Sequence, residues 1–321
     1  MTSRTTDSLD HFVRNSQLMV PRGSHPPGPA RVLLGWLPQE HGESLLARLA
    51  EDGLPETQRA RVSQARDAVA ARPAGIDQAG LISPLPDELA DHVSRLGATP
   101  EGARMRAEGW EIAMVDLARV VAVAPSVFTD TAVERAAGLD PGDLRAIAAL
   151  TLPVSHPRPV GDLSPSDDVT PVGLQYHYLT QTYTIISPNL NLTVAGNFDA
   201  PGNRDAQLPG GLMGHGFNIT VPPSFIQVAR FQGRYLLRDG HHRSFGLLSR
   251  GITRVPAYVR DVFSAEELVP GETETLPRGA WLGDRPPLLR DYHDDLVAEP
   301  VLSPVPHRMI VIHAVELLIV N

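Results

Sequence analysis

The sequence contains no cysteine and no lysine, so that all 28 of its basic residues are arginines. The missing cysteine excludes disulfides, a thiol nucleophile and thiolate zinc sites. The missing lysine excludes a Walker lysine, a kinase strand lysine and a Schiff base. Any phosphate binding must therefore use arginine, histidine, backbone groups or a metal.

A positive overall charge is also lacking, because the formal net charge is −9 at pH 7. Non-specific nucleic-acid binding depends on neutralising several phosphates, so this balance argues against nucleic acid as a partner. The longest strongly apolar run, residues 309–320, is too short to span a bilayer and contains His313 and Glu316. No secretion signal opens the chain. We therefore expect a cytoplasmic protein without membrane contact.

Proline and glycine are abundant, with 30 and 27 residues, and predict long irregular connections in an otherwise globular chain. We expect residues 1–30 to form a disordered tail and residues 31–152 a mostly helical region. A proline-rich linker follows over 153–172, and a β-rich domain over 173–321. The sequence thus predicts an α+β fold whose N-terminal half is mostly helical.

The helical region has recognisable starts and faces. An amphipathic face begins near Leu45, and the arginine- and alanine-rich stretch 57–71 follows it. Further helices are predicted over 89–96, from Thr99 through Leu117, and over 142–150. Three roles stay open for this region: it could cover the β-rich domain, form a homo-oligomer or shape a substrate pocket.

The β-rich domain contains a predicted hairpin, with strands over 225–231 and 234–238 joined by the turn Gln232-Gly233. A helix over 244–250, ending at Gly251, and a strand over 254–260 come next. Residues 175–186 and 191–195 also read as strands, while 308–320 could be a closing strand or a short helix.

The pentapeptide Asp239-Gly240-His241-His242-Arg243 stands where the second hairpin strand turns into the helix. Backbone N–H groups and the helix dipole converge at such a junction, which makes it a candidate anion site. A guanidinium can hold phosphate oxygens with two hydrogen bonds, and an imidazole N–H adds a donor. The alternative to an anion site is a turn with a structural role alone, because Asp-Gly is a common turn sequence.

With its flanking strands, from Phe225-Ile226-Gln227-Val228 to Val255-Pro256-Ala257-Tyr258-Val259, the pentapeptide resembles the core of the ParB/sulfiredoxin superfamily over roughly residues 222–262. The resemblance implies a mixed β-sheet domain whose glycine turn and helix N-terminus bind nucleotide phosphates. Members include chromosome-partitioning proteins that bind CTP, sulfiredoxins that use ATP and serine kinases that use ADP. ATP, ADP or CTP with Mg²⁺ is therefore the implied cofactor.

The resemblance also implies roles for individual residues. Gly240 would give close backbone approach, Asp239 would position the turn, and His242 and Arg243 would face a phosphate. We accordingly predict catalytic residues and ligand-binding residues at the turn, the former being Asp239, His241, His242 and Arg243 and the latter Gly240 and Ser244.

The chain also departs from the family. Sulfiredoxin has a cysteine at the position of His241, so its thiol chemistry is excluded here. The second nucleotide motif of the partition proteins and their helix-turn-helix are missing from this sequence. The serine kinases need a carboxylate base outside the turn, for which the candidates by proximity in sequence are Asp199, Asp205, Glu266 and Glu267.

A glycine-rich cluster over 210–218 precedes the first hairpin strand. It is either a flexible loop or a lid over the same pocket, with His215 as a ligand-binding candidate. We predict no metal ligands, because adjacent histidines on a turn reach one ion only with unusual backbone geometry and no His-Glu-x-x-His pattern exists. The stretch Tyr292-His293-Asp294-Asp295 is expected to be a solvated loop.

The leading hypothesis is a small-molecule enzyme that binds a nucleotide or another phosphorylated ligand at the turn 240–243, with phosphoryl transfer as one reaction. One alternative is a tailoring enzyme of natural-product or other small-molecule metabolism that uses the same pocket with a different substrate or a metal. The other is a ParB-related DNA-associated regulator, which the acidic charge disfavours.

Overall fold

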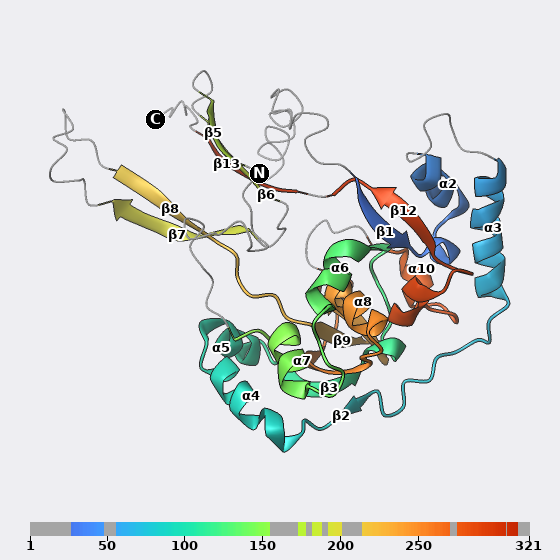
Figure 1. The fold of residues 1–321 in the computed structure, drawn as a ribbon, viewed down its shortest axis with the longest axis horizontal. Coiled ribbons are helices and arrows are strands. Elements are labelled where there is room, and N and C mark those ends of the chain that lie inside the picture. Colours follow the sequence, from blue (N-terminus) through green and yellow to red (C-terminus); the bar gives the residue numbers. More distant parts are fainter. Residues whose placement is uncertain are drawn as a thin grey trace, which may run out of the picture.

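The computed structural model describes residues 27–47, 56–154, 173–177, 182–187, 192–200, 214–269, 275–305 and 307–313. Within these residues, helices and several small sheets form a mixed fold that is consistent with the predicted α+β class (Figure 1). The predicted linker 153–172, apart from its first two residues, and the predicted tail up to residue 26 lie outside the described residues. Residues 28–30 of the predicted tail belong to a strand, Gly28–Val32.

The helices of the described chain are α2 (Gln39–Ala47), α3 (Glu56–Ala70), α4 (Ala90–Gly97), α5 (Pro100–Ala107), α6 (Thr129–Ala136), α7 (Leu144–Thr151), α8 (His241–Ser249), α9 (Ala265–Leu268) and α10 (Arg278–Trp281). Short 3-10 helices are η1 (Leu34–Trp36), η2 (Asp87–Leu89), η3 (Leu117–Arg119) and η5 (Leu289–His293). The strands are β1 (Gly28–Val32), β2 (Ile82–Ser83), β3 (Glu111–Asp116), β4 (Ser126–Phe128), β5 (Gly173–His177), β6 (Thr182–Ser187), β7 (Thr193–Ala200), β8 (Gly214–Thr220), β9 (Gln227–Phe231), β10 (Arg234–Asp239), β11 (Arg254–Asp261), β12 (Glu299–Ser303) and β13 (Arg308–His313).

A five-stranded mixed sheet with the order β10-β9-β11-β3-β2 forms the centre of the fold. β9 and β10 are the predicted hairpin, and the φ angles of its turn residues Gln232 and Gly233 are 49° and 78°. Positive φ at both positions gives the turn a twist that matches the flanking strands. β11 runs parallel to β9, and β3 runs antiparallel to β11.

The helix predicted from Thr99 through Leu117 is wrong in its second half. It starts as predicted, because Thr99 Oγ1 accepts the N–H of Gly102 at 3.0 Å and Pro100 lies in the first turn. It then ends at Ala107, and Glu111–Asp116 becomes β3, which pairs along its whole length with β11. Pairing and burial in the sheet here override the local helical pattern.

The region 31–152 contains the helices α2 to α7, but it is not separate from the β-rich half. It contributes strands β2 and β3 to the same sheet as β9, β10 and β11. It also contributes β4 and the last two residues of β1 to a second sheet, with the order β12-β1-β4. The two predicted regions share their sheets, since segments far apart in sequence pair directly.

The smaller sheets settle two further expectations. β13 pairs antiparallel with β6, so the described part of 308–320 is a strand and not a helix. β7 and β8 form a two-stranded ribbon, and the second half of the glycine-rich cluster, from Gly214, is a strand and not a loop.

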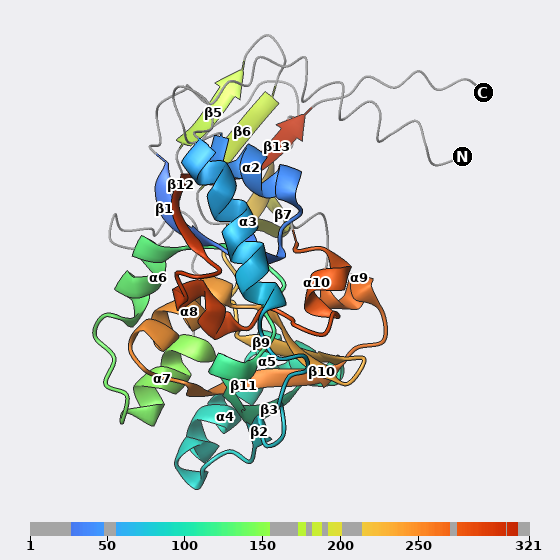
Figure 2. The same cartoon turned by 90° about the vertical axis from the view of Figure 1, so that its right-hand side faces the viewer.

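The helices α6 and α8 cross in close contact beside the central sheet (Figures 1 and 2). A Cβ atom added at Gly246 of α8 would lie 2.0 Å from the carbonyl oxygen of Ala132 in α6 and 2.8 Å from its carbonyl carbon. Both atoms belong to the backbone, so a rotamer change cannot relieve the overlap. Glycine at this position therefore sets the distance between the two helices.

We predict that Gly246→Ala lowers the free energy of unfolding by about 3 kcal/mol, because the helices must separate. In an uncrowded helix the same change would stabilise the protein by about 1 kcal/mol through helix propensity. Urea denaturation of the wild type and the variant measures the difference. Gly138→Ala is the control, since nothing lies within 4 Å of a Cβ there. Equal stability of the two variants would contradict the close approach of α6 and α8.

Candidate functional site

The predicted anion site lies where β10 ends at Asp239 and α8 begins at His241, three residues earlier than the sequence suggests. Gly240 joins them with a φ of 97° in the left-handed region. A Cβ at this position would lie 2.9 Å from Ile226 Cγ1 and 3.2 Å from Ile226 Cα. Both the backbone conformation and the space thus require glycine. The early start of α8 places both histidines in its first turn.

Asp239 holds this turn with both carboxylate oxygens. Oδ1 accepts the N–H of Gly240 at 2.6 Å, and Oδ2 accepts the hydroxyl of Ser224 at 3.0 Å. A β-bulge at Arg238 precedes it, since Leu237 pairs with Val228 and Asp239 pairs with Gln227. Bulges redirect the following side chains, and this one aims the end of β10 at the residues before β9.

Arg243 is 7% exposed and directs its guanidinium into the protein. It donates to the carbonyl oxygen of Ser224 at 2.5 Å, to Ser224 Oγ at 2.7 Å and to the carbonyl oxygen of Leu150 at 3.2 Å. Burial lowers the pKa of Arg243, and the carboxylate of Asp239 opposes this shift. These hydrogen bonds fasten α8 to α7 and to the segment before β9. They use three of the N–H groups that a phosphate would otherwise engage.

The two histidines are packed differently. His241 Nε2 accepts the backbone N–H of Ala124 at 3.4 Å, whereas the ring of His242 stacks on Phe128 of β4 at 5.8 Å between centroids. Burial, and then His242, lowers the pKa of His241 to about 3. Burial, and then Arg135, lowers the pKa of His242 to about 4. Both rings are therefore neutral at pH 7 and act as hydrogen-bonding groups without charge.

The first turn of α8 has backbone N–H groups that lack an acceptor in the described chain. Gly240 is its N-cap and provides no side-chain cap, and Ser244 N–H is the first to bond back, to the Gly240 carbonyl at 2.8 Å. The backbone N–H groups of residues 241–243 have no acceptor among the residues that the structure describes. Ser244 has no exposed area, and its Oγ likewise has no partner in the described chain. Unpaired N–H groups and the positive end of a helix dipole favour an anion at this position.

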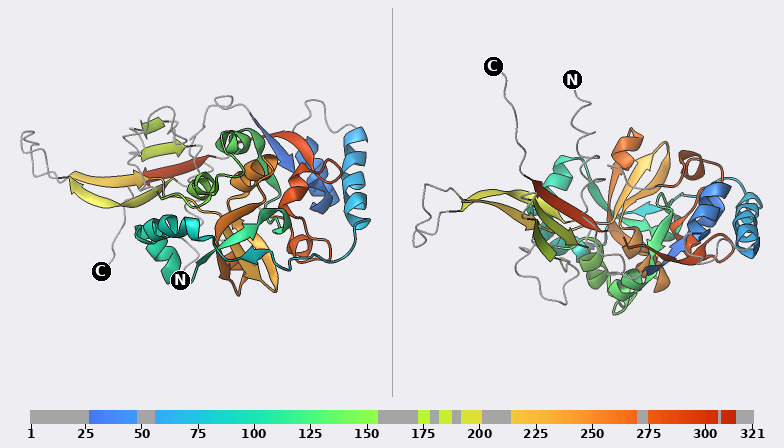
Figure 3. Two further views of the ribbon diagram at one scale, coloured as in Figure 1. Left: turned by 60° about the horizontal axis from the view of Figure 1, so that its bottom comes forward. Right: turned by 90° about the horizontal axis from the view of Figure 1, so that it is seen from above.

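His215 is not brought to this turn. It lies in β8, where it pairs with Asp199 of β7. In Figures 1 and 3 the β7–β8 ribbon extends away from the part of the molecule that contains α8. The structure therefore separates two of the predicted contributors, His215 and the candidate base Asp199, from the pentapeptide. Glu267 in α9 instead forms an ion pair with Arg260 at 3.4 Å.

Sequence reasoning missed the residues that hold the turn in place. These residues come from three separate segments of the chain and are Leu150, Ser224, and the pair Ala124 and Phe128. Arg243 and Leu150, for example, are 93 positions apart. None of them belongs to a recognisable motif, and their contacts arise only through the tertiary fold.

The expectation of a solvated loop over residues 292–295 is also wrong for Tyr292. Tyr292 is fully buried in η5, and its hydroxyl donates to the carbonyl oxygen of Ala124 at 2.6 Å. His293 stacks on Phe245 of α8, with the ring centroids 4.2 Å apart. Ala124 thus contacts His241 through its N–H and Tyr292 through its carbonyl, which joins η5 to the start of α8.

Among the residues that the structure describes, no group of three or more histidine or acidic side chains could hold a metal ion. No helix in the same part of the chain has the length and apolar character needed to cross a membrane.

Comparison with known proteins does not assign a family. No family model matches the chain, and no curated protein or solved structure matches it significantly. The resemblance of residues 222–262 to the ParB/sulfiredoxin core therefore stays a prediction from the motif and its flanking pattern.

We predict that Gly240→Ala destabilises the protein by about 2–3 kcal/mol, since it adds backbone strain to the overlap with Ile226. Thermal or urea unfolding measures this cost. Gly251→Ala is the matched control, because Gly251 also has a positive φ, 75°, but nothing lies within 4 Å of its added Cβ. The control should lose only about 1 kcal/mol. Equal losses in both variants would show that Ile226 does not restrict the turn.

A second prediction concerns pH. The folded pKa values of His241 and His242 lie below the ordinary value of 6.5, so protons bind the unfolded chain first. Their contribution to stability is complete above that value and is lost as the pH falls toward about 4. Because both residues are partly exposed, and solvent screening reduces the energy of such shifts, we expect each to contribute about 1 kcal/mol to the loss between about pH 7 and pH 5.

His241→Gln and His242→Gln should each reduce this loss when urea denaturation is repeated across the pH range. His41→Gln in α2 serves as the control for removing one histidine from the unfolded chain. A pH dependence identical to that of the wild type in both variants would rule out neutral, buried imidazoles at the turn.

Proposed function

We propose that this protein is a small-molecule enzyme that binds a nucleotide or another phosphorylated ligand at the turn Gly240–Arg243. The observation that carries the proposal is the first turn of α8, whose N–H groups at residues 241–243 have no acceptor in the described chain. Such groups, aligned with the helix dipole, form the phosphate-binding arrangement found at many helix N-termini.

The side chains around the turn support different parts of this role. The neutral ring of His242 can donate one further hydrogen bond to a phosphate oxygen. The buried guanidinium of Arg243 places a positive charge near the turn. Its hydrogen bonds to Ser224 and Leu150 hold the backbone N–H groups of the turn in place. We therefore assign Arg243 to positioning, and the direct contacts to the backbone and His242.

The charges near the turn indicate why Mg²⁺ would assist. Asp239 lies next to Gly240, and its carboxylate would repel a phosphate. Its two oxygens already accept one hydrogen bond each but keep further lone pairs. A magnesium ion carried by ATP, ADP or CTP would reduce this repulsion. Asp239 is also the carboxylate nearest in sequence to the turn, and so we propose it as the base if the reaction is phosphoryl transfer.

Calorimetric titration of ATP, ADP, CTP and GTP with magnesium tests the proposal, with inorganic pyrophosphate as a ligand that lacks a base and sugar. We expect saturable binding of at least one of these. His242→Glu should weaken it about tenfold or more, since a carboxylate at the helix N-terminus stabilises the helix but competes with phosphate.

Gln64→Glu is the matched control, because it adds the same charge on the exposed face of α3. Binding should change less than about twofold in this variant. If neither a nucleotide nor pyrophosphate binds, or if both variants bind equally well, the turn is not a phosphate site.

A further inference from the structure

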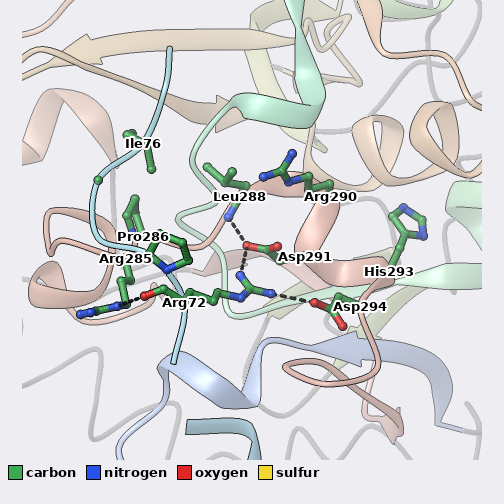
Figure 4. A pocket seen from close by; sticks show the side chains of 11 residues that line it. Arg72, Ile76, Arg285, Pro286, Leu288, Arg290, Asp291, His293 and Asp294 are labelled. Atoms are coloured by element: carbon green, nitrogen blue, oxygen red, sulfur yellow. Dashed lines mark hydrogen bonds and ion pairs between the residues drawn. The ribbon is translucent and has the colours of Figure 1, made fainter. Parts of the chain in front are cut away.

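A separate cavity of about 560 Å³ lies between the segment that follows α3 and the segment that contains η5 (Figure 4). Residues 72–76 line one side, and residues between 285 and 294 line the other. This volume is typical of sites for small molecules. None of these residues belongs to the pentapeptide.

Arg72 joins the two sides through a network of charges. Its guanidinium lies 3.1 Å from Asp291 Oδ2 and 2.7 Å from Asp294 Oδ2, between the two carboxylates (Figure 4). Asp291 is 4% exposed and also accepts the N–H of Leu288 at 2.7 Å. Burial raises the pKa of Asp291, which the Leu288 N–H and Arg72 oppose. The guanidinium of Arg72 is thus already paired with the two carboxylates of the protein.

Two other arginines supply charge that the cavity does not neutralise. Arg285 uses its Nε to donate to the carbonyl oxygen of Arg72 at 2.5 Å. Arg290 is exposed and has no hydrogen bond or ion pair with the part of the chain that the structure describes. Arg72 and the two aspartates together leave one negative charge, against which Arg285 and Arg290 place two positive charges. The lining therefore carries one excess positive charge and favours a monoanion.

The remaining walls are apolar and stiff. Ile76 and Leu288 lie at the upper side of the view in Figure 4, and the ring of Pro286 lies between Arg285 and Leu288. Prolines have a fixed φ and lose little entropy when a ligand binds beside them. An apolar wall next to a surplus guanidinium is complementary to a ligand with one charged end and one apolar end.

We propose that this cavity binds a small organic carboxylate with an apolar body. The carboxylate contacts Arg290, which lies beside Leu288 in Figure 4, and the body packs on Ile76, Pro286 and Leu288. A dianionic phosphate suits the site less well, because its second charge would face Asp291 and Asp294 without compensation. The inference goes beyond the proposed phosphate site and does not depend on it.

The cavity nevertheless touches the elements that hold α8. His293 lines the cavity and stacks on Phe245 of α8, and its neighbour Tyr292 bonds to Ala124, which contacts His241. A ligand in the cavity would therefore contact η5 directly, and η5 packs on the helix whose first turn carries the proposed phosphate site.

Benzoate and benzamide test this proposal, because they share a shape and differ in the charge of one end. We expect benzoate to bind the intact protein at one saturable site in calorimetry, and benzamide to bind at least about tenfold more weakly. Arg290→Gln should weaken benzoate about tenfold without changing thermal stability, since its side chain is exposed. Arg145→Gln, at an exposed position of α7, should leave benzoate binding unchanged.

Three results would overturn the proposal: no benzoate binding up to about 10 mM, equal binding of benzamide, or unchanged benzoate binding in Arg290→Gln. Inorganic phosphate, titrated in parallel, should bind this site more weakly than benzoate, and tighter phosphate binding that depends on Arg290 would also overturn it. His242→Glu should leave benzoate binding intact, so the carboxylate site and the phosphate site can fail independently.

Discussion

The hydrogen bonds of the buried Arg243 guanidinium are the interaction on which the candidate site depends. They join the first turn of α8 to the end of α7 and to Ser224, which in turn donates to Asp239. Burying a guanidinium costs several kcal/mol of solvation, and carbonyl acceptors offset that cost only with good geometry. The backbone around Gly240 is therefore held from both sides. Its unpaired N–H groups point in a fixed direction as a result.

In the structure, different residues of the pentapeptide shape the turn and present hydrogen-bond donors. The polar residues of the pentapeptide are equivalent when read along the chain, but in the structure the backbone N–H groups of residues 241–243 have no acceptor in the described chain and the ring of His242 stacks on Phe128. Asp239 and Arg243 are used to shape the turn. The site therefore relies more on oriented dipoles than on exposed charge. In a chain without lysine, this is one of the few routes to phosphate binding.

Local sequence predicted the features that depend on local physics. The Gln232-Gly233 turn, the stop at Gly251 and the start at Thr99 each follow from backbone conformation or capping, and each is present. Sequence failed at Glu111–Asp116, whose strand conformation depends on pairing with β11 well over a hundred residues later. It failed for the same reason to find Ser224 and Leu150, since nothing near them in the chain signals Arg243.

The second sheet has a consequence for how the protein acquires its structure during synthesis. β1 pairs with β4 on one side, but its other neighbour, β12, is Glu299–Ser303. While the ribosome makes the chain, β1 and β4 can meet early, yet the second edge of β1 stays open until almost all of the described chain has emerged. Pairing over such a sequence separation is slow, and an uncovered strand edge is a place where unfinished chains associate. Folding without association thus requires that other molecules cover the open edge of β1, or that synthesis reaches β12 quickly.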